Sequence, residues 1–600
     1  MSNEAWIPTF DGKGRHLGHL RDADAADLLL QASRGKGYTR VPVSFLVYRE
    51  SDVYKAKSGE TGRVEVEGED AWTVFNTVFQ KLTPGRAWRE TVAVRGSLTL
   101  GKILQVPGNT VLDLRGAELR LPDTLAEYCE IIRIGGDNVE IVGGILDGRR
   151  SAHGKDCFGV NCYGFSNVTV RGTVFRDLLA GVYIAGKGIL VDSCRFESDV
   201  HYGITNWAGG GEDVTVSNCS FRSKWAINVD MASARSSFRN LTVANCEGVG
   251  NLQAGTLGIA LASTADYTIT GVRIANCRFT DYGDECLHSE GTGTSNIQIV
   301  NSYFGRTARY ASVAIGLAGD QEHSGVQLSN VIVEGAKTNG ITVSVKDHAV
   351  LANVYVKNAG CHGVVLWGSG THTLTGVHAI DVGQALNVTY YGFAVQAKAR
   401  MIGCTCSYTG TIRPLVGARV YSAASGSELV ACELWGDYSS LWIDGANDVR
   451  AAGGRYTGGW GGRILVASAL RTRITGAEIA RHPDYGGVSE TGTSDYTVVE
   501  GCTFTGTGKA VVFAGANSVA RRNLGFTTEA SGTATIPAGS TYVDVSHGLE
   551  VTPKPERFRI IPLDNLGNRS FWVSDVTSTS FRINISSGDT VDHSFGWSYE

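Results

Sequence analysis

Proline, methionine and long apolar runs are scarce in this sequence. Its 600 residues include 11 prolines and 3 methionines against 77 glycines. Few stretches could run as long helices, so the composition favours a large all-β body. No apolar run approaches the about 18 residues of a membrane span, and residues 1–20 lack a basic-then-apolar export signal. We therefore expect a soluble chain with no signal peptide and no membrane partner.

Blocks of like charge and paired metal-binding cysteines are also missing. The formal net charge is -5 and no Lys/Arg-rich block occurs, so the sequence argues against a nucleic-acid partner. The 13 cysteines include no paired C-x-x-C pattern, which argues against a zinc site.

A short motif recurs about every 25 residues, a spacing typical of solenoids. Each copy is an alternating segment that ends on a glycine, serine or asparagine anchor, as in VTVSN (214–218) and VRIAN (272–276). A second alternating segment lies between anchors, as in GVYIAG (181–186). Two or three short strands per repeat, without helices between them, predict a parallel β-helix in which each coil covers the next. The anchors are Gly143, Gly172, Ser193, Asn218, Asn245, Asn276, Asn301, Asn330, Asn353, Gly376, Gly403, Gly453, Gly476 and Gly501.

Two ladders of identical residues follow from this alignment. Six of the 13 cysteines directly follow an anchor, so we expect them to point inward as small apolar side chains. The asparagine anchors are expected to stack in a turn ladder that satisfies backbone groups. The cysteines of the ladder are Cys194, Cys219, Cys246, Cys277, Cys404 and Cys502, with Cys432 in the matching place of its coil.

The two ends of the chain differ from the repeats. Residues 1–68 lack the motif and hold one candidate helix, DADAADLLLQAS (22–33). The segment EDAWTVFNTVFQKL (69–82) has the apolar spacing of an amphipathic helix, which we expect to cover the open end of the solenoid. After about residue 526 the alternating segments predict a separate small β-sandwich over 526–600. The repeats between, residues 69–525, are expected to carry the catalytic site.

The repetitive body resembles the pectate-lyase-like right-handed β-helix superfamily. That superfamily holds polysaccharide lyases, polygalacturonase-type hydrolases, mannuronan C5-epimerases and viral tailspikes. The segments GTATIPAGSTYVDVSHGL (532–549) and FWVSDVTSTSFRINI (571–585) resemble a C-terminal module of phage tail proteins. Together the resemblances imply a right-handed β-helix and a virus-derived, glycan-active protein, virion-associated or extracellular, that assembles as a homotrimer.

Side chains alternate in and out along a strand, so the repeat alignment also predicts an outer face. In GVYIAG, Val182 and Ile184 are expected inside and Tyr183 outside. The same alternation in the equivalent strands of the other coils predicts an outer face made mostly of small residues. We call this face the floor, and it would suit a polymer chain. The larger outward residues are Asn228, Asp230, His288 and Glu290, with Trp207 and Trp367 toward the two ends.

The residues just before each of these strands should form a rim beside that face. Side chains on neighbouring coils can touch, so acids, a histidine, an arginine and a tyrosine are expected to converge. We expect the tryptophans, Tyr202, Lys224 and Asn228 to bind substrate. The rim residues are His201, Tyr202, Lys224, Trp225, Asp284, Glu285, Arg309 and Tyr310.

Such a patch fits the cleavage of an acidic, uronate-containing glycan by β-elimination. The reaction needs a cation that neutralises the carboxylate, a base for the proton on the adjacent carbon, and an acid for the leaving oxygen. Arg309 or Lys224 would neutralise, and His288 and Tyr310 would act as base and acid. Asp230 is a further candidate carboxylate on this face.

β-Elimination with Arg309 or Lys224 as the neutralising cation requires no cofactor. A bound calcium ion is an alternative source of that positive charge. Asp284, Glu285 and Glu290 would then hold a Ca²⁺ ion that bridges to the substrate, because Ca²⁺ prefers carboxylate oxygens.

Three other functions stay open. The DEC of residues 284–286 resembles the DDC of polygalacturonase-type hydrolases, which would make Asp284 and Glu285 an acid/base pair. The chain departs from that family on the preceding coil, AGTLGIAL (254–261), where the family has an aspartate. It departs again on the following coil, RYAS (309–312), where the family has GHG.

The segment SDVHYG (198–203) is similar to the Asp-Pro-His motif of mannuronan C5-epimerases, with Val200 in place of proline. That resemblance implies catalytic roles for Asp199, His201 and Tyr202. A glycan-binding adhesin without catalysis is the last alternative, since it would also use tryptophans along a groove.

Overall fold

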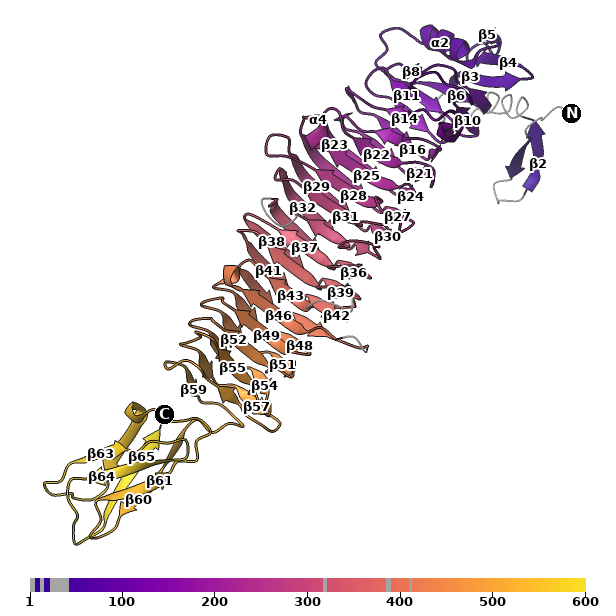
Figure 1. The fold of residues 1–600 in the computed structure, drawn as a ribbon. Coiled ribbons are helices and arrows are strands. Elements are labelled where there is room, and N and C mark those ends of the chain that lie inside the picture. Colours follow the sequence, from indigo (N-terminus) through magenta and orange to yellow (C-terminus); the bar gives the residue numbers. More distant parts are fainter. Residues whose placement is uncertain are drawn as a thin grey trace. The chain divides into compact units, whose positions relative to one another are not determined.

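The computed structural model describes residues 6–10, 16–21, 43–316, 321–384, 390–410 and 413–599. Within these ranges the chain divides into two compact units, Met1–Ala349 and Val350–Glu600. Each contains successive coils of short strands that stack in parallel, coil on coil (Figure 1). The predicted all-β parallel solenoid is therefore confirmed.

Every coil of the first unit contributes to three sheets, which we name in chain order the anchor, middle and wall sheets. The anchor sheet holds β6 Glu90–Val94, β9 Thr110–Asp113, β12 Glu140–Val142, β16 Thr169–Arg171, β20 Leu190–Asp192, β23 Gly211–Ser217, β26 Phe238–Ala244, β29 Ile269–Ala275, β32 Thr294–Val300 and β35 Ser324–Ser329. The middle sheet holds β7 Gly96–Thr99, β10 Ala117–Arg120, β13 Ile145–Asp147, β17 Val174–Arg176, β21 Arg195–Phe196, β24 Ser220–Phe221, β27 Glu247–Val249, β30 Arg278–Thr280, β33 Tyr303–Phe304 and β36 Ile332–Glu334. The wall sheet holds β8 Leu104–Val106, β11 Cys129–Ile134, β14 Cys157–Asn161, β18 Ala180–Tyr183, β22 Tyr202–Asn206, β25 Trp225–Asp230, β28 Leu257–Ala262, β31 Leu287–Glu290, β34 Val313–Ile315 and β37 Ile341–Ser344.

The second unit repeats the same three sheets. Its anchor sheet holds β41 Thr371–Thr375, β44 Ala399–Ile402, β47 Glu428–Val430, β50 Arg450–Ala452, β53 Arg473–Thr475, β56 Val498–Glu500 and β59 Val519–Arg521. Its middle sheet holds β39 Tyr355–Lys357, β42 His378–Ile380, β45 Thr405–Ser407, β48 Glu433–Gly436, β51 Arg455–Gly458, β54 Glu478–Ala480 and β57 Thr503–Thr505. Its wall sheet holds β40 Val364–Trp367, β43 Tyr391–Val395, β46 Val416–Tyr421, β49 Ser439–Asp444, β52 Ile464–Ala467, β55 Val488–Thr491 and β58 Val511–Val512.

The conformation of the turn after each anchor strand explains why the anchor residue is so often asparagine or glycine. The backbone there is left-handed, with φ of 54° at Asn276 and 48° at Asn301, a conformation that asparagine and glycine tolerate best. The Asn276 amide also donates to Asn245 at 3.2 Å and accepts from Asn301 at 3.3 Å. The predicted asparagine ladder is confirmed.

The interior of the solenoid is apolar, and like side chains stack from coil to coil. All seven cysteines of the predicted ladder are free and buried. Phenylalanines of the middle sheet stack face to face, Phe175 on Phe196 at 4.8 Å and Phe196 on Phe221 at 4.7 Å between ring centroids. The same apolar side chain in successive coils therefore packs the core in regular layers.

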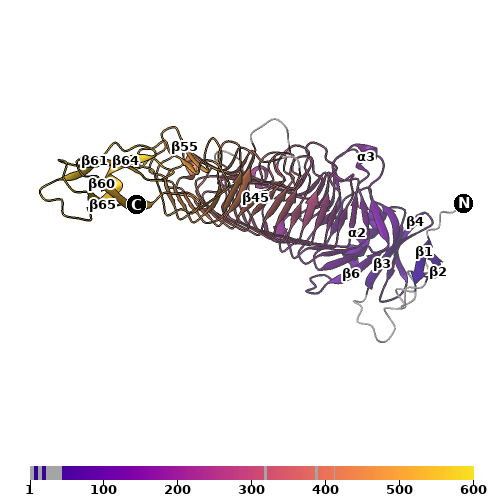
Figure 2. The same ribbon diagram turned by 90° about the horizontal axis from the view of Figure 1, so that it is seen from below.

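A helix covers the first coils, as the sequence predicts. Helix α2 (Ala71–Lys81) begins at Asp70, whose carboxylate accepts from the Thr73 amide at 3.0 Å. Its buried face packs toward β8, and the Trp72 indole donates to the Ile103 carbonyl at 2.9 Å. Figure 2 shows α2 beside β3 (Val43–Glu50) and β4 (Val53–Ser58) at this end.

The region before this helix is partly joined to the solenoid. Strand β3 pairs in parallel with β6, while β4 and β5 (Val64–Gly68) extend it as antiparallel neighbours. Further upstream, β1 (Trp6–Phe10) and β2 (His16–Arg21) form a two-stranded antiparallel sheet. The helix predicted over 22–33 lies outside the described residues. None of the helices in the described ranges has the length and apolarity of a membrane span.

The C-terminal residues form two antiparallel three-stranded sheets around a core of their own. One sheet has the order β60 (Ala530–Ile536), β65 (His593–Tyr599), β62 (Phe558–Pro562), and the other β61 (Tyr542–Ser546), β64 (Ser580–Ile585), β63 (Phe571–Ser574). Phe581 and Phe595 are fully buried between them. This matches the small β-sandwich expected here.

Candidate functional site

The strand phase that the site depends on is confirmed in the wall sheet. In β31, Leu287 is buried and the His288 side chain points outward, where it stays 16% exposed. In the sheet register, His288 lies between Ala260 of β28 and Ala314 of β34. Both register neighbours are alanines, so His288 has the larger side chain on this part of the outer face.

Two carboxylates hold the His288 imidazole from opposite sides. Nδ1 lies 3.7 Å from a Glu285 oxygen, and Nε2 lies 3.4 Å from a Glu290 oxygen. Burial by itself lowers the pKa of His288, but the two carboxylates outweigh it and raise that pKa to about 9. His288 is therefore an imidazolium at neutral pH, and the same contact lowers the pKa of Glu290.

This protonation state changes the role that the sequence suggested for His288. A group that is already protonated at neutral pH cannot accept a proton, so His288 is not a general base there. It can donate a proton or stabilise negative charge.

A second cluster lies on the rim formed by neighbouring coils. An Arg309 Nη donates to Asp284 at 3.2 Å, and its other Nη donates to the Tyr310 hydroxyl at 3.0 Å. The guanidinium also lies 4.9 Å from the centre of the Tyr310 ring. Asp284 accepts in addition from the Gly255 amide at 3.2 Å, so it links three successive coils. The contact between residues 284 and 309 that the repeat predicts is present.

The three acids of this region do not converge on one point. Asp284 faces Arg309, whereas Glu285 and Glu290 contact different nitrogens of His288. Across the described ranges, no group of three or more His, Cys, Asp or Glu side chains is placed to hold a metal ion. These residues do not fit a bound Ca²⁺, which takes about six to eight oxygen ligands.

Two other polar residues of the predicted floor form hydrogen bonds with nearby residues of the chain. Asp230 caps the short helix α4 (Met231–Ala234), accepting from the amide of Ser233 at 2.9 Å and from its hydroxyl at 2.6 Å. Asn228 is buried, and its amide donates to the Thr205 hydroxyl at 3.3 Å. Both lie on the predicted face, but each already has a partner.

A continuous aromatic patch covers the coils before the His288 coil. Tyr202 lies 5.2 Å from Trp207 and 5.5 Å from Trp225 between ring centroids, and Trp207 lies 5.6 Å from Phe158. One strand, β28, lies between β25, which holds Trp225, and β31, which holds His288, so these two strands are about 10 Å apart. The patch is made of Tyr128, Phe158, Tyr163, Tyr183, His201, Tyr202, Trp207 and Trp225.

Only part of this patch was predicted from the sequence. Phe158, Tyr202 and Trp225 hold the same register position on β14, β22 and β25, with Ala180 of β18 between the first two. A search for aromatics at equivalent positions of the repeat would have found Phe158. Tyr128 and Tyr163 lie outside the wall strands, so no such signal marks them.

Glu130 is a further residue that the sequence analysis missed. This buried carboxylate accepts from the Tyr128 hydroxyl at 2.8 Å, the Asn161 amide at 2.8 Å and the Arg133 guanidinium at 2.8 Å. Burial tends to raise the pKa of Glu130, but these three donors outweigh it and lower that pKa. Glu130 is an ionised anchor for the start of the patch.

The remaining predicted residues lie at the edges. Asp199 and Lys224 are exposed, and the His201 ring lies 4.4 Å from that of Tyr202. Burial, aided by the nearby Lys224, lowers the pKa of His201, so this imidazole is neutral at pH 7. Trp367 belongs to the second unit, where it packs against a cluster that includes Val365 and Tyr391.

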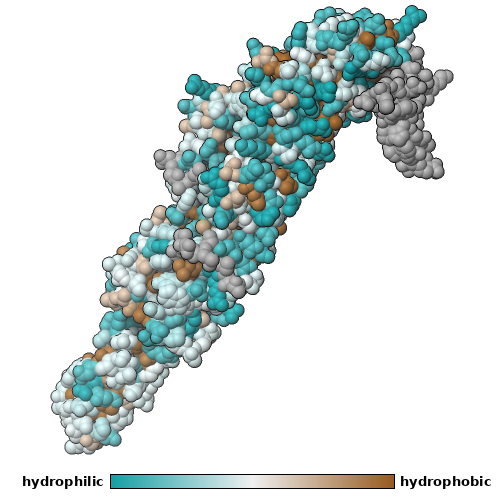
Figure 3. Space-filling model, turned by 45° about the vertical axis from the view of Figure 1, so that its right-hand side comes forward, coloured by the Kyte–Doolittle hydropathy of each residue, from teal (hydrophilic) through white to brown (hydrophobic). Residues whose placement is uncertain are grey.

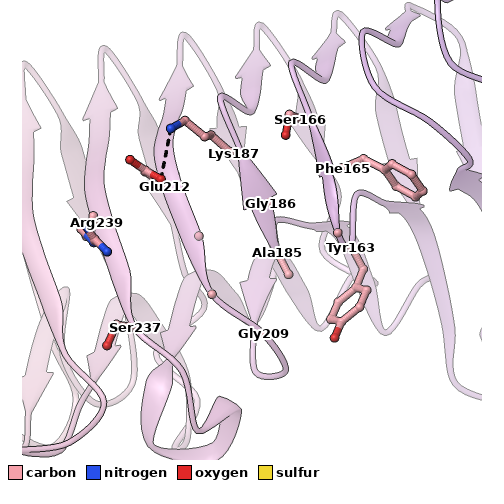
Figure 4. A pocket seen from close by; sticks show the side chains of 13 residues that line it. Tyr163, Phe165, Ser166, Ala185, Gly186, Lys187, Gly209, Glu212, Ser237 and Arg239 are labelled. Atoms are coloured by element: carbon pink, nitrogen blue, oxygen red, sulfur yellow. Dashed lines mark ion pairs between the residues drawn. The ribbon is translucent and has the colours of Figure 1, made fainter.

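A hollow of about 420 Å³ adjoins the aromatic patch. Figure 4 shows Tyr163 on one side of it and the ion pair of Lys187 with Glu212, 3.3 Å apart, across the strands, with Arg239 on the next coil. Tyr163 is 56% exposed and contacts Tyr183, so the hollow and the patch share a ring. Figure 3 shows a largely hydrophilic face with small, separate hydrophobic patches.

Comparison with known proteins agrees with this architecture. A family model described as "Right handed beta helix region" matches residues 158–321, which include the aromatic patch from Phe158 onward and the His288 and Arg309 clusters. No curated protein matches the chain.

Several solved structures align with long stretches of it. A mutant tailspike protein of E. coli bacteriophage HK620 in complex with a hexasaccharide is 12% identical, with 96% of this chain and 100% of that chain covered and a TM-score of 0.32. The A-module of mannuronan C-5 epimerase AlgE4 from Azotobacter vinelandii is 11% identical, with 72% and 91% covered and a TM-score of 0.27. At these identities and scores the alignments assign no activity or residue to this chain. The described residues within 158–321 form a right-handed parallel β-helix.

Proposed function

We propose that the first unit binds an acidic polysaccharide along its wall sheet and cleaves it by β-elimination. The observation that carries the proposal is the presence of two clusters on successive coils, His288 with Glu285 and Glu290 and then Arg309 with Tyr310, beside an aromatic patch. Aromatic rings suit the apolar faces of sugars, and an extended sheet face suits a polymer.

The charges and hydrogen bonds of Arg309, Tyr310 and His288 suggest the role of each residue in β-elimination. Arg309 would neutralise the uronate carboxylate, and Tyr310, whose hydroxyl oxygen accepts from that guanidinium, would act as the base. It removes the proton on the carbon next to the carboxylate. The electron pair left behind forms a double bond to the neighbouring carbon, whose bond to the glycosidic oxygen breaks. His288 gives its proton to that oxygen.

Hydrolysis is a second candidate because Glu285 and Glu290 flank His288. The lowered pKa of Glu290 keeps it ionised, so it would activate a water while His288 protonates the leaving oxygen. This reading needs no uronate in the substrate. Epimerisation through Asp199, His201 and Tyr202, and glycan binding without catalysis, are the remaining alternatives.

The reaction products distinguish a lyase, a hydrolase, an epimerase and an adhesin. The full-length protein is incubated with a panel of acidic and neutral polysaccharides. New chain ends that absorb in the ultraviolet as unsaturated uronates indicate a lyase, and reducing ends without that absorbance indicate a hydrolase. An intact chain with altered sugar stereochemistry indicates an epimerase, and binding alone an adhesin.

Substitutions then test the roles. For a lyase, His288→Gln and Tyr310→Phe should each lower kcat at least about a hundredfold, the usual contribution of a general acid or base. His348→Gln, at an exposed histidine elsewhere in the unit, is the matched control and should keep full activity. Full activity in Tyr310→Phe would rule out the lyase assignment. A loss confined to Glu290→Gln and His288→Gln would favour the hydrolase.

We also propose, from the sequence resemblance to tailspikes, that the protein acts as a virion-associated homotrimer. Light scattering coupled to size-exclusion chromatography tests the assembly, because a trimer has three times the chain mass of 63.8 kDa.

A further inference from the structure

The second unit carries a hollow that the proposed reaction does not use. It measures about 250 Å³ and lies on the outer face of the middle sheet, over β45, β48 and β51. The residues that point inward from these strands, Cys406, Leu434 and Tyr456, are buried in the solenoid core. The side chains between them therefore point outward and line the hollow.

Those outward side chains form two rows across three coils. Their chemistry is mixed, with three hydroxyls, one carboxylate, one guanidinium and one indole, which together supply both donors and acceptors. The first row is Thr405, Glu433 and Arg455, and the second is Ser407, Trp435 and Thr457.

An aromatic pair forms one side of the hollow. Tyr408 and Trp435 lie 4.1 Å apart between ring centroids at 46°, and both remain partly exposed. Arg413 lies over both rings, 5.1 Å from the first and 5.7 Å from the second, and pairs with Asp437 at 3.6 Å. The guanidinium fixes the rings in place, so the platform is formed before any ligand arrives.

The charges around the hollow do not favour an anion. Arg455 is paired with Glu478 at 3.4 Å, and Arg413 with Asp437. Glu433 is exposed and adds a further carboxylate. Of the residues that line the hollow, Glu433 is the one acid and Arg455 the one arginine, and Arg455 is already paired with Glu478, so the lining offers a uronate no net attraction.

From this geometry we infer that the hollow binds an uncharged sugar unit of a glycan chain. The ring stacks on Tyr408 and Trp435, and its hydroxyls bond to Glu433, Arg455 and the neighbouring side-chain hydroxyls. The volume lies below the about 300–1,000 Å³ of pockets that enclose whole small ligands, which suits one unit of a longer chain. This site needs none of the residues proposed for catalysis.

An array of immobilised oligosaccharides, neutral and uronate-containing, tests the inference with the full-length protein. Wild type should bind neutral members of the array. Trp435→Ala and Glu433→Gln should each weaken that binding at least tenfold without changing the binding of uronate-containing members. Trp572→Ala removes an exposed tryptophan of the C-terminal sandwich and should bind as wild type does.

Two controls separate the possible failures. Circular dichroism melting checks that each variant is folded, and Glu433→Gln alters an exposed side chain that folding does not need. His288→Gln disables the proposed reaction and should leave neutral-sugar binding unchanged. Each proposal can therefore fail without the other. The inference is overturned if wild type binds no neutral member, or if Trp435→Ala and Glu433→Gln bind them as strongly as wild type.

Discussion

At the scale of single residues, His288 makes stability depend on pH. Its pKa is raised from the ordinary 6.5 to about 9, so its contribution is fully present below pH 6.5 and is lost as the pH rises through 9. The contribution is about 3 kcal/mol. We expect the free energy of unfolding of the wild-type protein to fall across this window, whereas His288→Gln should lack that component. Urea denaturation at several pH values measures both, and parallel profiles would contradict the assignment.

The thiols give a second test at this scale. All 13 cysteines are free, and all but Cys361 are buried. Burial raises the pKa of Cys162 and Cys406 to about 12, so these thiols stay protonated and inert. We expect a thiol reagent at mildly alkaline pH to label native protein at Cys361 alone and unfolded protein at every cysteine. Rapid labelling of a ladder cysteine such as Cys246, located by peptide mass mapping, would show that the core opens.

The outward placement of His288 was predictable from the sequence, but its protonation state was not. Alternation around Leu287 fixes which way the side chain points, because strand phase has a period of two. The pKa depends instead on burial and on the distances to Glu285 and Glu290, which only the folded coil sets. The sequence therefore predicts where the imidazole points but not its protonation state, and its catalytic role stays a prediction.

At the scale of elements, the asparagine turns combine two stabilising effects that one pair of variants separates. Asn276 has a left-handed backbone, and its amide group bonds to the coils on either side. Asn276→Gly keeps the backbone freedom and loses the amide bonds, at a cost of about 1 kcal/mol. Asn276→Ala loses both, and should be less stable than the glycine variant by about 1–2 kcal/mol. Urea denaturation compares them. Equal stability would mean that the backbone conformation at this turn contributes little.

Regular elements were the most predictable from the sequence, and contacts across coils the least. The helix expected over 69–82 is α2 (Ala71–Lys81), since its apolar spacing and the Asp70 cap are local signals. The aromatic patch depends instead on rings from several coils, and Tyr128 joins it from outside the wall strands. Such a residue has no periodic signature, so only the folded chain reveals it.

At the scale of the whole molecule, repetition explains why so much of the fold was visible in the sequence. Each coil contacts mainly its two neighbours, so one alignment of anchors fixes the register of an entire unit. The same property makes the ends vulnerable, because among the described residues the first coil has a preceding strand only at β6, which pairs with β3. Its strand edges carry backbone groups that another chain could pair with.

Helix α2 protects that end, and one substitution on its buried face tests this. Phe75 is fully buried between the helix and the first strands, so Phe75→Asp would place an unpaired carboxylate in an apolar site and detach the helix. We expect a lower melting temperature and, on warming, a faster rise in light scattering as exposed edges associate. Asn76→Asp introduces the same charge at the next, exposed position of α2 and should behave as wild type does. If both variants scatter light alike, charge rather than loss of the cap is responsible; if neither scatters more than wild type, the helix is dispensable for protecting the edge.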